Sequence, residues 1–166
     1  MKLSIRPVLE MDAHAITLLI NPIILQRTLT SMQDVLTIDV QRDFIRSLPR
    51  KSTCLVAVDE MTGRIVGIQD VLPVANSDKK SPEVGEISTF VDLAMARNGI
   101  GSRLCAETFA VTKLIGFSRL RATIRRDNQP AIEFYQRMGF RIDGHVHDSK
   151  MTWNRSVDLI GAEKLL

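Results

Sequence analysis

The chain is poor in the residues that build disulfide frameworks, metal sites and membrane spans. Its two cysteines, Cys54 and Cys105, lie far apart and lack metal-ligand spacing, so we expect a reduced, cytoplasmic protein. The most apolar stretch, residues 15–25, contains Asn21 and Pro22 and is too short to cross a bilayer. The N-terminus carries charge where a secretory signal needs an apolar run, and we expect no membrane partner.

Histidine is scarce, and no charge of one sign dominates. His145 and His147 alternate on a predicted strand without an evident third ligand, so we expect no metal. The net charge is +3, and the basic residues are mostly scattered, which argues against a nucleic-acid partner. One local basic cluster is typical either of a solvated strand edge or of a contact with nucleotide phosphates; it comprises Arg119, Arg121, Arg125 and Arg126.

The rest of the composition and the apolar periodicity predict one folded domain over residues 1–166. Hydrophobic residues make up 45% and charged residues 25%, without repeats or a linker. A first helix begins at Asp12 and is expected to be interrupted at Pro22, with residues 23–30 continuing as helix or loop. Further helices are predicted at 39–48, 99–117 and 128–138, and strands at 2–8, 53–58, 64–72, 84–91, 119–126, 140–147 and 157–162, with a loop at 76–82. This order predicts a mixed α+β sheet, mostly antiparallel, with one parallel strand pair and helices on both faces.

Gly99-Ile100-Gly101 follows a predicted strand and opens the longest helix. Such glycines let the backbone approach a phosphate, and the free N–H groups at the helix start point toward it. A dinucleotide fingerprint would need a glycine at Leu104, and a P-loop would need Gly-Lys-Ser/Thr. The segment therefore predicts a site for another phosphate ligand, with N–H donors from Asn98 to Leu104 and added charge from Arg97 and Arg103.

Two motifs resemble those of the GNAT superfamily of acyl-CoA-dependent N-acetyltransferases. Residues 96–101 are similar to its pyrophosphate loop, Arg/Gln-x-x-Gly-x-Gly/Ala, with Ala96 in the place of Arg or Gln. A later pattern, Asn-x-x-Ala-x-x-Phe-Tyr-x-x-x-Gly-Phe, is matched in full by Asn128, Ala131, Phe134, Tyr135, Gly139 and Phe140. The resemblance implies a GNAT-like fold and transfer of acetyl from acetyl-CoA to a primary amine of a small molecule, by direct attack in a ternary complex.

The resemblance also implies the residues that act. Tyr135 is the expected general acid for the leaving thiolate, although it would also fit as a core residue beside Phe134. The expected cofactor-binding residues are Phe90, Val91, Arg97, Asn98, Gly99, Ile100, Gly101, Ser102, Arg103, Asn128 and Tyr135. Main-chain groups around Phe90 and Val91 are expected to bind the pantetheine arm, and an N–H of this strand to polarise the thioester carbonyl. Asn128 would also serve as a helix cap.

Glu86 is the expected general base. It lies in an otherwise apolar or small-residue strand, where a carboxylate is costly unless it is used or paired. The phosphinothricin N-acetyltransferase-like branch has the similar pattern Glu-x-Ser-x-Tyr/Phe-Val-Asp, which here spans Glu86 to Asp92. The alternatives are an exposed glutamate or a partner for an arginine or lysine. That branch grips a substrate carboxylate with basic residues after the third strand, and residues 71–75 contain none, which argues against phosphinothricin itself.

Two other functions remain open at this stage. A non-catalytic acyl-CoA sensor would be consistent with Ala96, and a protein or peptide N-acetyltransferase would use the same chemistry. A homodimer paired through the final strand is a further expectation. Cys105, near the apolar stripe of the long helix, is expected to be buried core rather than a nucleophile.

Overall fold

The computed structural model describes residues 2–74, 83–144 and 158–166. The predicted loop at 76–82, His145, His147 and the first residue of the predicted final strand lie outside these ranges. In order, the elements are β1 (Leu3–Pro7), η1 (Glu10–Asp12), α1 (Ala13–Leu25), α2 (Ile38–Arg46), β2 (Thr53–Asp59), β3 (Ile65–Pro73), β4 (Val84–Val91), η2 (Leu93–Met95), α3 (Ile100–Leu114), β5 (Arg119–Arg125), α4 (Gln129–Arg137), β6 (Arg141–Ile142) and β7 (Leu159–Leu165).

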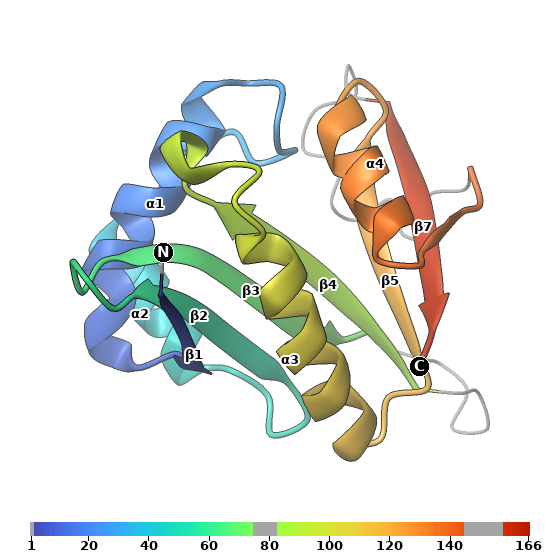
Figure 1. Cartoon of the computed structure of the whole chain (residues 1–166), viewed down its shortest axis with the longest axis horizontal. Coiled ribbons are helices and arrows are strands. Elements are labelled where there is room, and N and C mark those ends of the chain that lie inside the picture. Colours follow the sequence, from blue (N-terminus) through green and yellow to red (C-terminus); the bar gives the residue numbers. More distant parts are fainter. Residues whose placement is uncertain (1, 75–82, 145–157) are drawn as a thin grey trace.

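A seven-stranded sheet in the order β1-β2-β3-β4-β5-β7-β6 forms the middle layer. The helices α1 and α2 cover one face, and α3 and α4 cover the other (Figure 1). Only β4 and β5 pair in parallel, and the other neighbours are antiparallel. The predicted mixed α+β fold is therefore confirmed.

The parallel pair is short, and this creates the central feature of the fold. The ladder between β4 and β5 joins only Val84–Glu86 to Arg119–Arg121, after which the strands diverge (Figure 1). Each half of the sheet then packs on its own core, one around Ile100 and Leu104 of α3 and the other around Tyr135 of α4. Within the described ranges, the β5-facing edge of β4 from residue 87 to 91 has no strand partner.

The first helix does not stop at Pro22, contrary to the prediction. α1 is continuous from Ala13 to Leu25, with Pro22 inside it. Proline removes one backbone hydrogen bond from a helix interior. Here Ile20, Ile23 and Ile24 are buried on both sides of it in the core beneath α1, and this burial outweighs the lost bond.

Several boundaries also differ from the prediction. Asp12 stands at the N-cap position of α1, but its carboxylate binds the Arg6 guanidinium and the Leu9 N–H instead of capping that helix. The long helix ends at Leu114, before Gly116 takes a left-handed φ of 94°. Of the described part (140–144) of the predicted strand, β6 takes only Arg141–Ile142, and β7 extends to Leu165. None of the described helices is long and apolar enough to span a membrane.

Candidate acyl-transfer site

The loop between β4 and α3 has the backbone of an anion site. Arg97 and Gly99 both take left-handed conformations, with φ of 64° and 76°, and Gly99 directly precedes α3. A Cβ at Gly99 would meet no atom within 4 Å, so glycine serves the backbone conformation there rather than packing. Left-handed residues turn successive N–H groups into a concave surface, and the helix start adds its positive dipole end. The predicted phosphate loop therefore has a suitable conformation.

Gly101 connects this loop to the second motif. A Cβ at Gly101 would lie 2.9 Å from the ring of Phe134, so the missing side chain lets α4 approach the first turn of α3. Phe134 in turn packs edge-on against Tyr135 with ring centroids 5.1 Å apart. The phosphate loop and the candidate acid thus belong to one packed unit across the gap between β4 and β5.

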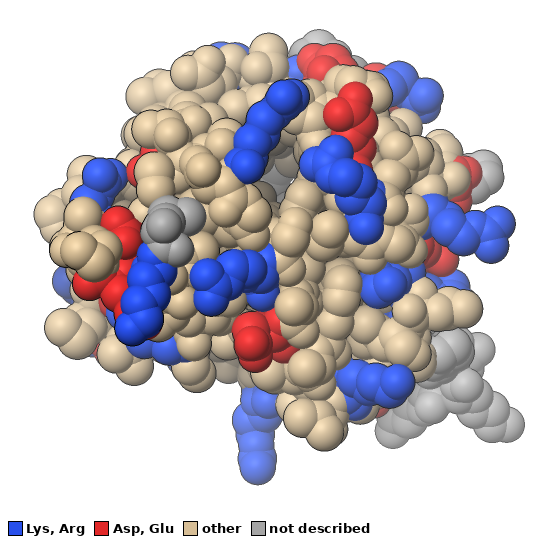
Figure 2. Space-filling model, viewed as in Figure 1, with Lys and Arg blue, Asp and Glu red and all other residues tan. Residues whose placement is uncertain are grey.

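The surface around this gap is hollowed and basic. Figure 2 shows a hollow high in the middle of this face, with Lys or Arg side chains on both sides of it. It lies where Figure 1 places the start of α3 opposite α4. A basic rim suits a ligand that carries phosphates.

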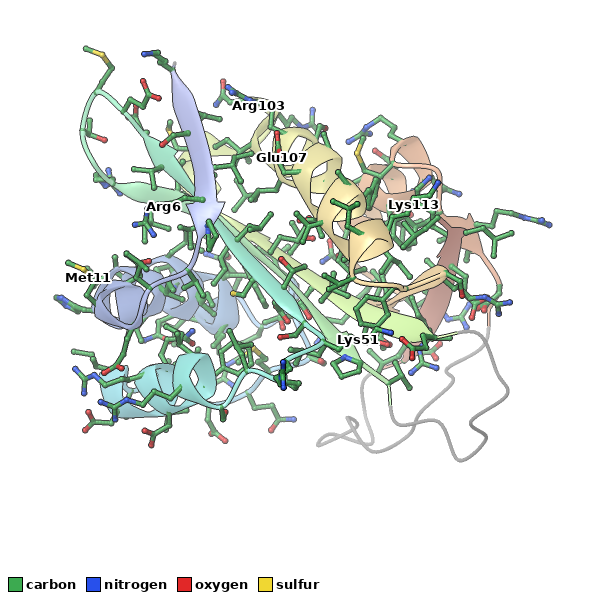
Figure 3. All side chains as sticks on the ribbon, turned by 90° about the horizontal axis from the view of Figure 1, so that it is seen from below. Arg6, Met11, Lys51, Arg103, Glu107 and Lys113 are labelled. Atoms are coloured by element: carbon green, nitrogen blue, oxygen red, sulfur yellow. The ribbon has the colours of Figure 1, made fainter. Side chains whose placement is uncertain are left out.

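The individual arginines differ from expectation. Arg103 donates to the Leu3 carbonyl at 3.0 Å and thus lies over β1, beside Glu107 (Figure 3), away from the predicted phosphate contact. With Ile5, Ala106 and Glu107 it lines a shallow pocket of about 260 Å³ on the outer side of α3, remote from the gap. Arg97 lies in the left-handed turn itself, and its predicted phosphate contact stays a prediction.

The basic cluster on β5 is neutralised within the chain. Its four members each bind a different carboxylate, in the pairs Arg119–Glu163, Arg121–Glu86, Arg125–Asp127 and Arg126–Asp158. The prediction of a solvated strand edge is wrong, because β5 lies between β4 and β7 and the side chains of Arg121 and Arg125 are only 11% and 13% exposed. Phosphate contact is disfavoured too, because each guanidinium already has an anionic partner. The sequence alone left these two readings open.

Asn128 combines two local roles. Its Oδ1 accepts from the Ala131 N–H at 3.2 Å, which confirms the predicted cap of α4. Its Nδ2 donates to the Leu29 carbonyl at 2.9 Å and so fastens the loop after α1 to α4. The predicted contact of Asn128 with the cofactor arm stays a prediction.

Tyr135 lies at the inner end of the gap and is 6% exposed. Its ring packs edge-on against Phe134 and Phe140, so the core alternative is also realised. Its hydroxyl lies 3.0 Å from Thr89 Oγ1 on β4. Burial raises the pKa of Tyr135 above its usual range, with the Thr89 hydrogen bond opposing the shift. The phenol therefore keeps its proton at neutral pH and is available as a donor.

Behind Thr89 lies a buried amide that the sequence did not indicate. Gln69 of β3 is fully buried and donates from Nε2 to Thr89 Oγ1 at 2.8 Å and to Cys105 Sγ at 3.3 Å. Its Oε1 has no hydrogen-bond partner among the described residues. Thr89 Oγ1 accepts from Gln69 and also shares a hydrogen bond with the Tyr135 hydroxyl, in which either oxygen can be the donor. Gln69 and Thr89 therefore fix the position of the phenol oxygen.

Glu86 is held on both carboxylate oxygens. Oε2 accepts from Arg121 Nε at 2.8 Å, and Oε1 accepts from the Thr123 hydroxyl at 2.7 Å. Both donors come from β5, at the point where the two strands begin to part. The alternative of an arginine partner is therefore realised, and the base role of Glu86 stays a prediction.

Asp70 of β3 is a second carboxylate close to Glu86 that the sequence analysis missed. The ladder places Asp70 opposite Ser88 and Leu72 opposite Glu86. Asp70 and Glu86 are therefore diagonal neighbours on one face of the sheet. Its strand contains the polar pair Gln69-Asp70 in the sequence, but only the pairing register of β3 and β4 brings the carboxylates of Asp70 and Glu86 together.

Both cysteines are buried and have free thiols, as expected for Cys105. Burial raises the pKa of the Cys105 thiol to about 11, which disfavours the thiolate that a nucleophile needs. Across the described ranges, no cluster of three potential metal ligands occurs.

Fold and site together define an α+β fold in which a left-handed glycine turn at a helix start lies beside a diverging pair of parallel strands. A profile of the acetyltransferase (GNAT) family matches residues 24–140, and the chain therefore belongs to this family and is an acyltransferase. No curated protein sequence matches it significantly.

Solved structures with the same fold include proteins with different acceptors. A phosphinothricin acetyltransferase from Sinorhizobium meliloti, solved with acetyl-CoA, has a TM-score of 0.84 at 19% identity, covering 100% of this chain and 89% of that one. A ribosomal-protein-alanine N-acetyltransferase from Brucella melitensis has a TM-score of 0.84 at 22% identity, covering 98% and 99%. At these identities the likeness shows the fold and leaves the acceptor open.

Proposed function

We propose that this protein transfers acetyl from acetyl-CoA to a primary amine of a small molecule by direct attack in a ternary complex. The observation that carries the proposal is the Gly101–Phe134 contact, which packs the anion-binding loop and the buried phenol of Tyr135 on the two sides of one gap. A covalent route through Cys105 is disfavoured by its burial and raised pKa.

The residues around the gap fit acetyl-CoA, the cofactor of the family. The left-handed turn at Arg97 and Gly99 and the N–H groups at the start of α3, from Ile100 to Arg103, would hold the pyrophosphate. The unpaired edge of β4, including Phe90 and Val91, offers main-chain groups to the pantetheine arm as a neighbouring strand would. Arg97 supplies the positive charge that Ala96 lacks.

Acetyl-CoA supplies an activated acetyl group as a thioester. An N–H of β4 would donate to the thioester oxygen, where negative charge develops. Tyr135 would give its proton to the leaving sulfur, because burial keeps the phenol protonated and Thr89 fixes the position of its oxygen. A carboxylate on the α1 face of the sheet would take the proton of the amine, and Glu86 is the residue that the sequence predicts for this role.

Location and assembly are part of the proposal. We place the protein in the cytoplasm, as its free thiols suggest. A homodimer through the final strand stays a prediction: β5 pairs with one edge of β7 along its length, and β6 pairs with the other edge at two residues.

The test is release of free thiol from acetyl-CoA with a panel of amino acids, polyamines, aminoglycosides and short peptides, after cofactor binding has been confirmed by thermal shift. Turnover on free amines supports the proposal. Acetylation of peptides alone would favour a protein acceptor, and binding without any turnover would favour a sensor. Failure to bind acetyl-CoA would contradict the assignment of the loop.

A further inference from the structure

Asp70 lies on the face of the sheet that α1 and α2 cover. Its strand neighbour Gln69 points toward Cys105 of α3, so by alternation Asp70 points to the opposite face, with α1 and α2. On the two flanking strands it is opposite Cys54 and Ser88. The loop after α1, fastened to α4 through the Leu29–Asn128 bond, crosses toward the gap from this same side.

Asp70 is the less constrained of the two carboxylates on this face. No side chain in the described part of the protein forms a hydrogen bond or an ion pair with it, whereas Arg121 and Thr123 occupy both oxygens of Glu86. Asp70 is half-buried as a residue, while its carboxylate group lies in a largely desolvated position. An unpaired carboxylate in a central strand is costly unless it is used.

The groups that surround Asp70 favour its neutral form. α1 contributes Ile16, Leu19, Ile20, Ile23 and Ile24 to the core on this face, and β2 contributes the protonated Cys54 thiol. Charged groups on or beside this face in the described part of the chain include the Glu86–Arg121 and Asp12–Arg6 pairs. Burial is the main cause that raises the pKa of Asp70, to about 7, and the charge of Glu86 adds to it. Its own backbone N–H opposes the shift.

We propose that Asp70 accepts the proton of the incoming amine, while Glu86, held by Arg121 and Thr123, is a fixed anion that attracts the ammonium to this face. The inference rests on the proposed function and names its proton acceptor. It also indicates a cationic, rather than carboxylate-bearing, acceptor end, because two carboxylates line the approach.

The proton and electron balance is complete with acetyl-CoA as the only co-reactant. An N–H bond of the ammonium breaks, its proton moves to Asp70, and the nitrogen keeps the electron pair. That pair forms a bond to the acetyl carbon while the carbon–sulfur bond breaks. Tyr135 gives its proton to the sulfur and regains one from the nitrogen, and Asp70 later releases its proton to water.

The raised pKa of Asp70 matters because an alkylammonium is a weak acid and gives up its proton only to a sufficiently basic group. With a pKa near 7 rather than the ordinary 3.8, the proton-transfer equilibrium improves by about a thousandfold. A carboxylate fixed by an arginine and a hydroxyl gains no such advantage, since those donors favour its charged form.

The test compares D70N and E86Q, with D43N on the exposed side of α2 as a matched Asp-to-Asn control. For an amine that the wild type acetylates, the profile of kcat/KM against pH should rise with an apparent pKa near 7. The D70N variant should lack this limb of the pH profile. Its kcat should be lower by at least about 100-fold, and its Kd for acetyl-CoA should be unchanged. E86Q should keep the limb, moved to lower pH because the Glu86 charge helps to raise the pKa of Asp70, and should raise KM for the amine. D70E should restore part of the rate, and D43N should match the wild type.

A limb retained in D70N but lost in E86Q would overturn the proposal and leave the acetyltransferase function intact. A wild type that binds acetyl-CoA but acetylates no amine would instead overturn the proposed function and the Asp70 assignment with it. Unchanged thermal shifts by acetyl-CoA in D70N separate a chemical defect from a folding defect.

Discussion

Tyr135 is the only tyrosine of the chain, and its hydroxyl has a single described partner, Thr89. The residue motif predicted its place correctly, because aromatic residues three and four positions after Ala131 fall on the buried face of a short helix. It could not predict Gln69, whose amide meets Thr89 only through the pairing of β3 with β4.

At the residue scale, Y135F should lower kcat by about 10²-fold or more, because it removes one proton donor and little volume. The acetyl-CoA Kd should stay unchanged, and the loss of one buried hydrogen bond should destabilise the fold by about 1 kcal/mol. Steady-state kinetics and cofactor titration together check this. Unreduced turnover in Y135F would show that another group protonates the thiolate.

A second residue prediction concerns the partner of the phenol. T89V keeps the shape of Thr89 but removes the hydroxyl between Gln69 and Tyr135. The substitution removes one hydrogen-bond acceptor from the fully buried Gln69 amide, so we expect the free energy of unfolding to fall by about 1–3 kcal/mol. The kcat should fall, but less than in Y135F, because the phenol proton remains. Denaturant unfolding and kinetics measure the two effects separately.

At the scale of elements, the turn between β4 and α3 is the part that the sequence predicted best. Glycine spacing, a following helix and a preceding strand are local signals, and the left-handed φ values of Arg97 and Gly99 agree with them. The course of α1 was less predictable, since whether Pro22 ends a helix depends on core contacts distant in the chain. The divergence of β4 from β5 likewise has no local signature.

Gly99 offers an element-scale test with a matched control. Gly63, in the turn between β2 and β3, has a φ of 70° against 76° for Gly99, and neither position has an atom near a Cβ. G99A and G63A should each cost about 1 kcal/mol of stability through strain in the left-handed region. Only G99A should weaken acetyl-CoA binding, as isothermal titration would show. Equal acetyl-CoA affinities in G99A and G63A would show that the loop at Gly99 does not bind the cofactor.

For the whole molecule, the raised pKa of Asp70 links stability to pH. Between the ordinary value of 3.8 and about 7, the folded state holds a proton that the unfolded state has lost. The free energy of unfolding should therefore fall as pH rises through this window, and the loss persists above it. Replacing Asp70 by asparagine should remove this slope and stabilise the protein above pH 7 by up to about 4 kcal/mol.

Urea unfolding of wild type, D70N and D43N between pH 4 and 8 checks this. A wild-type slope that survives in D70N would place the titrating group elsewhere. A D70N protein that is more stable yet inactive would show that the Asp70 carboxylate destabilises the fold but is needed for the reaction.

The most direct test of the central claim is transfer of a ¹³C-labelled acetyl group from acetyl-CoA to a free amine, followed by mass spectrometry with wild type, Y135F and G99A. The account predicts labelled product with the wild type and slow formation of that product by Y135F, although Y135F binds the cofactor fully. The rate of G99A should approach that of the wild type at high acetyl-CoA concentration. Label found on no amine, or equally in all three proteins, would contradict it.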